Sequence, residues 1–290
     1  MSATDHFVEH RNLLFTVAYE LLGSSQDAED VLQETWLRWA SEEREDVRDP
    51  RAYLVRIVSR LSLNRLRTLS RQRETYVGPW LPEPLLTSPD VADDVELADS
   101  VSTAMLLVLE TLTPVERAVF CLREVFSLEY AEIAAAVEKS EDAVRQIAHR
   151  ARSHVAARRP RQEVTVSEQL AVVERFMGAA ETGDLQSLLD VLSPDVVLVT
   201  DGGGHKKAAL RPILGRDKAL RFLMAVSEGP LTARVVQVNG GVGLMIADAT
   251  GVDDTLVTML IEDGLVTGLY ALRNPEKLAA LGTDPVGLAR

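Results

Sequence analysis

The sequence predicts two all-helical domains, the second a helix-turn-helix, followed by one α+β domain. Apolar residues recur at helical spacing through the first half of the chain, where arginines gather in two stretches. After Pro160, short β-branched runs separated by glycines take over, and helices followed by strands are typical of an α+β domain. A length of 290 residues suits two or three domains. The expected domains are residues 1–75, 100–161 and 162–290, with residues 76–99 as a linker.

The composition excludes several classes of protein. Apolar residues make up 46% of the chain, enough for packed cores. No apolar run approaches the roughly 18 residues that cross a membrane, and the start of the chain lacks the basic and apolar order of a secretory signal. Cys121 is the single cysteine, so no internal disulfide can form. We therefore expect a cytoplasmic protein in which Cys121 is a small buried core residue.

The charge distribution favours a nucleic-acid partner, although the formal net charge of -13 argues against one. Residues 50–73 hold seven arginines and no acid, and a second basic stretch runs from Arg145 to Arg161. Because charges are screened beyond about 8–10 Å, the local field near a phosphate backbone matters more than the total charge. One such stretch would equally suit a solvated helix face. Two stretches make DNA binding the better interpretation.

Three amphipathic helices are expected in the first domain. The first spans residues 13–22, and the second covers residues 28–39. The third starts at Pro50, because proline is well placed in a first helical turn, and it carries the arginine-rich stretch. The side chains expected on its buried side are Tyr53, Leu54, Ile57, Leu61 and Leu66.

The linker has two parts. Residues 78–84 are too rich in proline for a helix or a central strand. Residues 88–99 add several acids, which is typical of a connecting segment. A tryptophan among prolines is unusual for a simple tether, so we expect Trp80 to dock on one of the folded domains.

The second basic stretch belongs to a predicted helix-turn-helix. Pro114 opens a helix, residues 129–134 form another, and after a break at Glu138 a further helix starts at Ser140, a good N-cap. Two helices this close together, the second rich in arginine, describe a helix-turn-helix. The apolar stripe expected to pack the last helix consists of Val144, Ile147, Ala148, Ala151 and Val155.

The opposite face of this last helix carries side chains that can read bases. Arginine can pair bidentately with guanine and glutamine with adenine, each contact contributing about 1–3 kcal/mol of discrimination. Arg152 and the arginines from Arg158 onward are better placed for phosphates, which position the protein without reading sequence. The residues expected to face DNA bases are Arg145, Gln146, His149 and Arg150.

The third domain begins with helices and continues with strands. A helix covers residues 170–177, and a second begins at Asp184. Residues 262–264 form a strong hairpin signal, so we expect an antiparallel sheet. The expected strands are residues 196–199, 233–238, 242–246 and 256–261, with a last strand after the hairpin.

Four segments of the first half resemble extracytoplasmic-function sigma factors. Residues 27–36 are similar to the helix that binds RNA polymerase, and residues 49–58 to the segment that melts and reads promoter DNA. Residues 112–120 and 143–146 resemble the second DNA-binding domain of the family. The resemblance implies that the polymerase core, through a basic coiled coil of its clamp, and promoter DNA are partners. The core-binding residues would be Asp27, Asp30, Gln33 and Glu34, and the DNA-binding residues of the first domain Arg51, Arg56, Arg60 and Asn64.

Three further motifs resemble the subgroup of these sigma factors that bears a SnoaL-like extension. They are residues 80–84, 201–204 and 274–278, although His205 stands where the subgroup usually has lysine. The resemblance implies a cone-shaped α+β (NTF-like) domain around an apolar pocket, which would contact the first domain and the linker and tune activity in cis. The interdomain residues implied are Trp80, Leu81, Pro82, Glu83, Pro84, Asp201, Gly202, Gly203, Gly204, Asn274, Pro275 and Lys277.

Two other functions remain open. The chain could be a ligand-gated helix-turn-helix regulator that does not bind the polymerase core, or an enzyme fused to a DNA-binding module. SnoaL-like enzymes use a buried carboxylate or histidine as a base, and the candidates here are Asp201, His205, Asp248 and Asp253. We expect no catalysis, because a carboxylate such as Asp201 in a glycine-rich turn commonly bonds backbone N–H groups.

No cofactor and no metal ion are expected. The five histidines are scattered or lie on the DNA-facing helix, and His6 and His10 share a helical face without a third ligand nearby. The other three are His149, His154 and His205. A small ligand of the C-terminal pocket remains a candidate partner.

Overall fold

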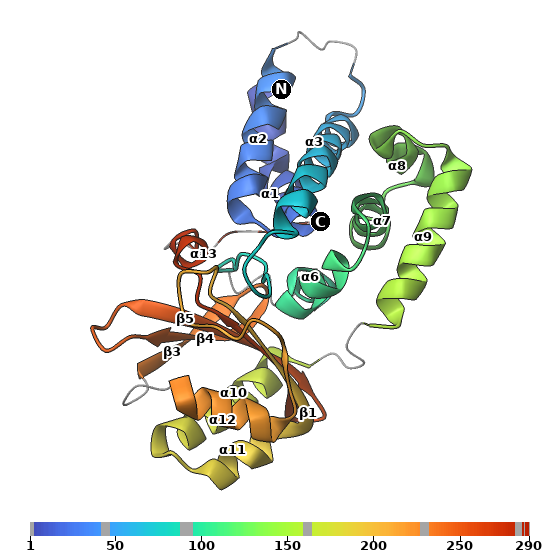
Figure 1. Ribbon diagram of the computed structural model, residues 1–290. Coiled ribbons are helices and arrows are strands. Elements are labelled where there is room, and N and C mark those ends of the chain that lie inside the picture. Colours follow the sequence, from blue (N-terminus) through green and yellow to red (C-terminus); the bar gives the residue numbers. More distant parts are fainter. Residues whose placement is uncertain are drawn as a thin grey trace.

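The computed structural model describes residues 3–41, 47–87, 95–158, 164–226, 232–281, 286 and 288–289. Two helical regions lie above a domain built on a twisted sheet (Figure 1). We call them the first helical region (residues 3–73), the second helical region (residues 95–158) and the C-terminal domain (residues 164–281). Part of the predicted linker, Arg159, Arg161 and the predicted boundary at residue 161 lie outside the described residues.

The first helical region has the three expected helices. They are α1 (Ala3–Leu22), α2 (Ser25–Ala40) and α3 (Pro50–Arg73). Ser24 caps α2 by accepting from the N–H of Asp27, so this helix begins ahead of the predicted residues 28–39. Asp49 caps α3 by accepting from the N–H of Ala52, so α3 begins at Pro50 as the sequence predicted. Leu54, Leu61 and Leu66 are buried as predicted, whereas Tyr53 and Ile57 are half-buried.

The second helical region contains short helices. They are α5 (Val95–Val101), α6 (Thr103–Glu110), α7 (Pro114–Phe120), the π-helical turn η1 (Cys121–Val125), α8 (Tyr130–Val137) and α9 (Glu141–Ala156). A capping box between Thr113 and Glu116 opens α7, and Ser140 caps α9. Residues 95–99, which the sequence placed in the linker, belong to α5.

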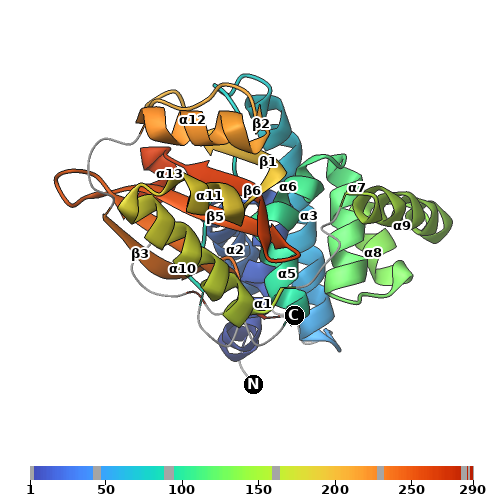
Figure 2. The same cartoon turned by 90° about the horizontal axis from the view of Figure 1, so that it is seen from below.

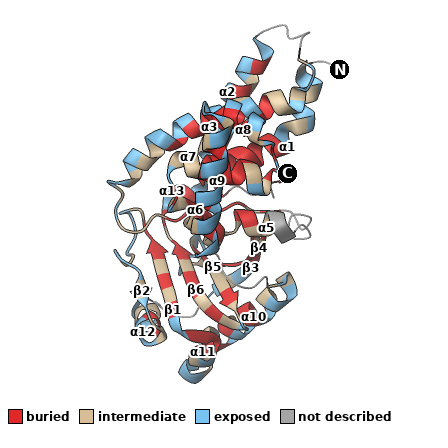
Figure 3. Ribbon diagram, turned by 90° about the vertical axis from the view of Figure 1, so that its right-hand side faces the viewer, coloured by how far each residue is buried: buried red, intermediate tan, exposed pale blue. Residues whose placement is uncertain are grey.

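The two helical regions share one hydrophobic core. Tyr19 and Leu54 from the first region and Leu106, Val119 and Ile133 from the second belong to a single buried cluster. Figure 3 shows these buried segments of α1, α3, α7 and α8 facing one another. The helices that the sequence assigned to separate domains therefore pack as one unit. Cys121 lies fully buried in this core, as expected.

The C-terminal domain is α+β, as predicted. Its helices are α10 (Val166–Thr182), α11 (Leu185–Val191), α12 (Arg216–Val226) and α13 (Pro275–Ala279). Its strands are β1 (Leu192–Asp201), β2 (Ile213–Leu214), β3 (Thr232–Val238), β4 (Gly241–Ala247), β5 (Asp253–Glu262) and β6 (Leu265–Leu272). The sheet order is β2-β1-β6-β5-β4-β3, and α10, α11 and α12 cover one face (Figure 2). The other face packs on Leu81 of the linker and on Leu107 of α6.

The sheet is mixed, so the prediction of an antiparallel sheet was wrong in one respect. Strands β3 to β6 form the expected antiparallel meander, and Asp263 and Gly264 take the positive φ angles that its last hairpin needs. The last strand of this meander, β6, then pairs in parallel with β1. This long-range pairing leaves no local pattern in the sequence, and neither does the two-residue strand β2. The helices α12 and α13 were not predicted, although Asn274 followed by Pro275 is a helix-start pattern.

A group of buried charges lies where α1, α5, α6 and α7 meet. Arg117 is buried and donates from Nε to the Glu20 carbonyl over 2.9 Å, and its guanidinium also bonds the carboxylate of Glu110. Glu20 is fully buried and accepts from the Ser100 hydroxyl over 2.5 Å. Burial raises the pKa of Glu20 to about 7, against the lowering effect of Ser100 and Arg117. The shared core is therefore sensitive to pH.

We expect the stability of the protein to depend on pH through Glu20. The pKa of its carboxyl group lies above the ordinary value when the chain is folded, so its stabilisation is complete at low pH and is lost as the pH rises through about 7. The unfolding free energy of the wild type should fall, relative to that of Glu20→Gln, by about 2 kcal/mol between about pH 5 and pH 8. Chemical denaturation at several pH values measures this, with the exposed Glu174→Gln as control. Parallel curves for wild type and Glu20→Gln would contradict it.

Candidate functional site

Helix α9 has the two faces that the sequence predicted. Its apolar stripe, from Val144 to Val155, is buried. The opposite face is exposed, and Arg145, Gln146, His149 and Arg150 line a shallow hollow on it. These side chains share an exposed helical face, which is the arrangement that a major-groove reader needs.

The arginines of α9 pair with acids of the same region. Arg152 bonds Glu124 over 2.7 Å, and Arg145 bonds Glu141 one turn before it. Arg145 also lies over the ring of Tyr130, 5.3 Å from its centroid. Because exposed ion pairs contribute about 0–1 kcal/mol, these arginines can exchange their carboxylates for phosphates at little cost.

The arginine-rich helix α3 exposes a second polar face. Its exposed members include the four that the sequence singled out, Arg51, Arg56, Arg60 and Asn64. Arg56 stacks over Tyr53 at 4.8 Å, and Tyr53 in turn contacts Trp39, so its ring is engaged in packing. Arg60 forms an ion pair with Glu138 at the end of α8. The second helical region thus contacts the face of α3 that was expected to hold DNA.

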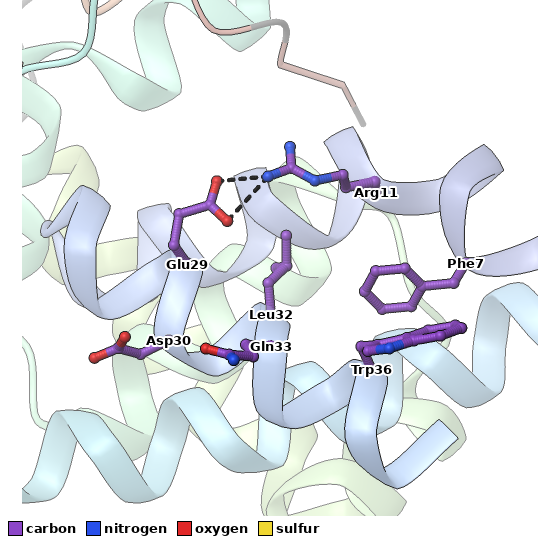
Figure 4. A pocket seen from close by; sticks show the side chains of 7 residues that line it. All are labelled: Phe7, Arg11, Glu29, Asp30, Leu32, Gln33 and Trp36. Atoms are coloured by element: carbon purple, nitrogen blue, oxygen red, sulfur yellow. Dashed lines mark hydrogen bonds and ion pairs between the residues drawn. The ribbon is translucent and has the colours of Figure 1, made fainter. Parts of the chain in front are cut away.

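The acidic face of α2 forms part of a shallow pocket with α1. Figure 4 shows Asp30 and Gln33 beside Leu32 and Trp36 of α2, with Phe7 and Arg11 of α1 across from them. Arg11 bonds both carboxylate oxygens of Glu29, at 2.7 and 2.9 Å, and the ring of Phe7 lies 5.1 Å from that of Trp36. Phe7 and Arg11 were not predicted from the sequence, although their spacing of four residues could have indicated one helical face.

The other two acids predicted for this face differ in their surroundings. Glu34 is exposed and pairs with Arg38 of the same helix over 2.7 Å. Asp27 is half-buried and accepts from Nε of Arg65 on α3 over 2.7 Å. Asp27 therefore ties α2 to α3, whereas Asp30, Gln33 and Glu34 project outward.

The residues expected at the domain interfaces meet around Asp201. Its carboxylate lies at the end of β1, is fully buried and accepts four hydrogen bonds. The donors are the Tyr76 hydroxyl at 2.7 Å, the Lys277 ammonium at 2.8 Å, the Leu81 N–H at 2.9 Å and the Gly203 N–H at 3.0 Å. We call Tyr76, Leu81, Asp201, Asn274 and Lys277 the linker clasp.

Lys277 connects the C-terminal domain to the linker twice. Its ammonium donates to Asp201 and also to the Leu81 carbonyl over 2.5 Å. Burial lowers the pKa of Lys277 to about 8, although the Asp201 carboxylate opposes this shift. The same ammonium lies 4.2 Å from the ring centroid of Trp80, whose ring also lies 3.7 Å from the Arg73 guanidinium. Trp80 therefore docks between α3 and α13, as the sequence predicted.

The glycines of residues 202–204 allow the clasp to close. A Cβ atom at Gly202 would lie 2.3 Å from the Lys206 carbonyl oxygen, and one at Gly203 would lie 2.3 Å from the Asn274 amide. Asn274 uses this approach: it caps α13 through Oδ1 and donates from Nδ2 to the Tyr76 hydroxyl over 2.8 Å. Pro275 follows at the first helical turn. The two C-terminal motifs thus hold Tyr76, which no sequence pattern marked.

A further linker residue, Glu83, contacts the first helical region. Its carboxylate accepts from the N–H groups of Ser25 at 2.8 Å and Gln26 at 3.3 Å, so it acts as a cap from outside the helix. Its carbonyl accepts from the Tyr19 hydroxyl over 2.6 Å. Pro82 and Pro84 flank this contact. Residues 80–84 are therefore held between the first helical region and the C-terminal domain.

Asn239 joins the linker, both helical regions and the sheet. It occupies the β3–β4 turn with a φ of 52°, where its backbone N–H and side-chain Oδ1 pair with Leu85 over 2.9 and 3.1 Å. Its Nδ2 donates to the Tyr19 hydroxyl at 2.6 Å and to the Val101 carbonyl at 2.8 Å. The contacts of Asn239 were not predicted from the sequence, because an asparagine before a glycine indicates a turn but does not indicate distant partners.

The end of the chain extends these contacts. The Thr87 N–H donates to the Gln237 carbonyl over 3.3 Å, and the Val286 N–H donates to the Leu86 carbonyl over 2.7 Å. The Ala289 N–H bonds the Thr16 hydroxyl on α1 over 3.0 Å, and Leu288 is buried in the shared helical core. Linker and tail thus add strand-like pairing beside β3 and end against the first helical region.

The four candidate bases have structural partners. Asp201 belongs to the clasp, and Asp248 bonds the hydroxyl and N–H of Thr250 within its own turn. Asp253 pairs with Arg234 over 2.7 Å, and the exposed His205 lies 3.7 Å from Glu276. Within the described ranges no three histidine, cysteine or acidic side chains are grouped so as to hold a metal ion. Among the described helices none is long and apolar enough to cross a membrane.

Comparisons with known proteins agree with this geometry. Residues 6–72 match the family described as Sigma-70 region 2, and residues 102–155 match Sigma-70, region 4. The chain is 38% identical over 286 residues to the ECF RNA polymerase sigma factor SigJ of Mycobacterium tuberculosis, covering 92% of this chain and 90% of that protein. It is 32% identical over 278 residues to the probable ECF RNA polymerase sigma factor SigI of the same organism, covering 95% and 94%. The crystal structure of the extracytoplasmic function sigma factor SigJ of Mycobacterium tuberculosis superposes with a TM-score of 0.78 at 35% identity, covering 96% of this chain and 100% of that one.

Replacing Asp201 should loosen the linker. In Asp201→Asn the shape is kept but Lys277 is deprived of its counter-charge, and breaking a buried ion pair costs about 3–5 kcal/mol. Burial lowers the pKa of Lys277 to about 8 even though Asp201 raises it, so without the Asp201 carboxylate this pKa should fall further, and deprotonation should limit the destabilisation as the pH rises. Limited proteolysis should therefore cut residues 76–87 faster in Asp201→Asn than in the wild type, most clearly at acidic pH. The exposed Asp217→Asn serves as control, and equal cleavage rates for all three proteins would contradict the role of the clasp.

Proposed function

This chain belongs to the extracytoplasmic-function sigma factors, and we propose that its C-terminal domain tunes its activity in cis by holding part of the linker, so that fewer free residues connect the two helical regions. A sigma factor of this family binds RNA polymerase core and directs transcription initiation at promoters, so the chain is not a regulator that works without the polymerase. It acts where the polymerase acts, in the cytoplasm.

The pairing of residues 81–87 with the C-terminal domain carries this proposal. An extended chain reaches at most roughly 3.5 Å per residue, so a linker held as far as Thr87 lets Val95 move at most roughly 28 Å from it. Were the linker held only as far as Glu83, the reach would be roughly 42 Å. The linker–Asn239 contact therefore controls how far the second helical region can separate from the first.

The packing of the helical regions gives this restraint a consequence. Promoter recognition uses two DNA-binding faces, one on α3 and one on α9, each of which must reach its own element. In the compact arrangement α8 contacts α3, and the carboxylate of Glu138 forms an ion pair with Arg60. A short linker favours this arrangement by keeping the effective concentration of one region near the other high. Release of the linker would favour the separated form.

The exposed faces of α2, α3 and α9 have different partners in this proposal. Asp30, Gln33 and Glu34 would bind the basic coiled coil of the polymerase clamp, because they are exposed acceptors on one face of α2. Asp27 would support them by fixing α2 to α3. The DNA-binding residues proposed for α3 are Arg51, Arg56, Arg60 and Asn64, and those for α9 are Arg145, Gln146, His149, Arg150 and Arg152.

The C-terminal domain acts through contacts and not through catalysis in this proposal. Asp201 accepts four hydrogen bonds, so its lone pairs are already used by the clasp. A small ligand of this domain would act by changing how the β3–β4 turn presents Asn239 to the linker. Binding at that distance changes transcription only if the ligand prefers one of the two linker states.

Substitution of Asn239 by glycine tests the proposal. Glycine keeps the turn, because it adopts positive φ without strain, while it removes three side-chain hydrogen bonds to Leu85, Tyr19 and Val101. Their removal should shift the linker equilibrium by about 1–3 kcal/mol, so transcription at limiting polymerase core should rise several-fold. In vitro transcription from a promoter of this sigma factor measures the effect.

The matched control for this test is Asp263→Gly. Asp263 lies in the β5–β6 hairpin with the same φ of 52°, away from the linker. Transcription by Asp263→Gly should equal that of the wild type. Unchanged transcription by Asn239→Gly, despite proteolysis showing a released linker, would contradict regulation through the linker.

Base reading by α9 is tested by Gln146→Ala. The affinity for a duplex with the preferred element should fall by about 1–3 kcal/mol, and a duplex with the contacted base changed should no longer be discriminated. Arg152→Ala, by contrast, should weaken all duplexes equally, because a phosphate contact carries no sequence information. Competition binding with both duplexes measures this, and an equal decrease on both for Gln146→Ala would contradict the assignment.

A further inference from the structure

Basic residues gather in one stretch of the C-terminal domain. Between residues 164 and 281 the sequence holds ten lysines and arginines, of which six lie between residues 206 and 221. The same stretch holds only Asp217 among the fifteen acids of this range. The remainder of the domain is strongly acidic, so this stretch stands out by its charge. Its basic residues are Lys206, Lys207, Arg211, Arg216, Lys218 and Arg221.

Four of these six side chains are exposed and form no ion pair within the part of the chain that the structure describes. Lys206 bonds Asp254 over 2.7 Å, and Arg216 is half-buried and donates to the Leu189 carbonyl. Lys207, Arg211, Lys218 and Arg221 are exposed, and no carboxylate among the described residues pairs with them. Asp217 adjoins Lys218 and lies one helical turn before Arg221, so it weakens the field of these two cations, whereas no acid adjoins Lys207 and Arg211 in the sequence.

This basic stretch adjoins the end of α3. A Cβ atom at Gly204 would lie 3.5 Å from Cβ of Val77, and one at Gly78 would lie 3.7 Å from the Leu210 side chain. The loop between β1 and β2 thus touches the chain just after α3. Figure 3 shows the exposed end of α3 on the same side of the molecule as β2 and α12, and Figure 2 agrees.

The last turns of α3 contribute further cations to this side. Arg67 and Arg71 are exposed, and the helix carries no acid. The resulting surface extends from a DNA-binding helix to the C-terminal domain, with the exposed Glu74 at the end of α3 as an acid beside it. We call it the lateral basic face, and its members are Arg67, Arg71, Lys207, Arg211, Lys218 and Arg221.

We propose that the lateral basic face binds the phosphate backbone of promoter duplex that adjoins the DNA held by α3. Phosphates are the partner that fits, because the face offers flexible cations and has no aromatic side chain among its members for stacking bases. Its continuity with α3 selects DNA over an acidic protein surface. The C-terminal domain would thereby contribute to promoter affinity without reading sequence, while the clasp keeps it beside α3.

The salt dependence of promoter binding tests this proposal. The test uses polymerase core with the full chain, bound to a duplex promoter fragment, and compares Lys207→Ala/Arg211→Ala with wild type. Removing one cation that neutralises a phosphate should lower the slope of log affinity against log salt by about 0.9, so the double variant should have a slope smaller by about 1.8. The decrease in affinity should be the same for promoters of different sequence.

A charge-matched control separates local from global effects. Arg175→Ala/Arg234→Ala removes two exposed cations from other parts of the same domain and should leave the slope unchanged. A second variant, Lys218→Ala, should lower the slope by about 0.9 on its own, which keeps the test independent of any change in the β1–β2 loop. Equal slopes for the double variant, the control and the wild type would overturn the proposal.

Two other outcomes would also overturn it. Weaker binding of Lys207→Ala/Arg211→Ala to polymerase core, with an unchanged salt slope on DNA, would mean that an acidic surface of the polymerase is the partner. Changed transcription with unchanged DNA affinity would mean that the loop acts through the linker alone. Neither outcome affects the role of Asn239, which is measured through transcription at limiting core.

Discussion

The buried ion pair between Asp201 and Lys277 determines how the linker, α3 and the C-terminal domain meet. Such a pair is stable only when its remaining lone pairs and protons are bonded. Here the linker supplies those partners: Leu81 gives its N–H to Asp201 and its carbonyl to Lys277, and Tyr76 gives its hydroxyl to Asp201. The charges are therefore satisfied only while the linker lies in place. One interaction thus specifies the linker path and brings Trp80 between α3 and α13.

Two junctions of the molecule, the linker clasp and the group around Glu20 and Arg117, contain buried charges as well as apolar packing. Buried charges specify an arrangement more than they stabilise it, because their desolvation offsets much of their attraction. Burial lowers the pKa of Lys277 in the clasp to about 8, and burial raises the pKa of Glu20, in the group around Arg117, to about 7. A compact form held in this way is well defined yet can be opened by a partner that offers better contacts, as polymerase and DNA would.

Local features of this chain could be predicted from its sequence. Asp49, Ser140 and Asp184 cap the helices that they were expected to start, and the apolar stripe of α9 is buried. These features depend on neighbours a few residues away. The segments 80–84, 201–204 and 274–278 were identified through a resemblance, and the structure brings them together around Asp201.

Long-range partners could not be predicted in the same way. Tyr76, Asn239 and the pairing of Val286 with the linker depend on contacts across more than a hundred residues. The parallel pairing of β1 with β6 and the contact of Arg60 with Glu138 also join residues far apart in the sequence, 78 residues in the case of Arg60 and Glu138. A turn residue such as Asn239 satisfies its local rule whether or not its side chain has a distant role, so only the folded structure assigns that role.

The distance between the two helical regions tests the account most directly. Spin labels at Val8→Cys on α1 and Ser153→Cys on α9 would report it by double electron–electron resonance, since both sites are exposed and the native Cys121 is buried. The account predicts one narrow distance distribution in the free protein, and added longer distances when Asn239→Gly releases the linker or when polymerase core is bound. The same narrow distribution in all three samples would contradict it, and so would a broad distribution in the free protein.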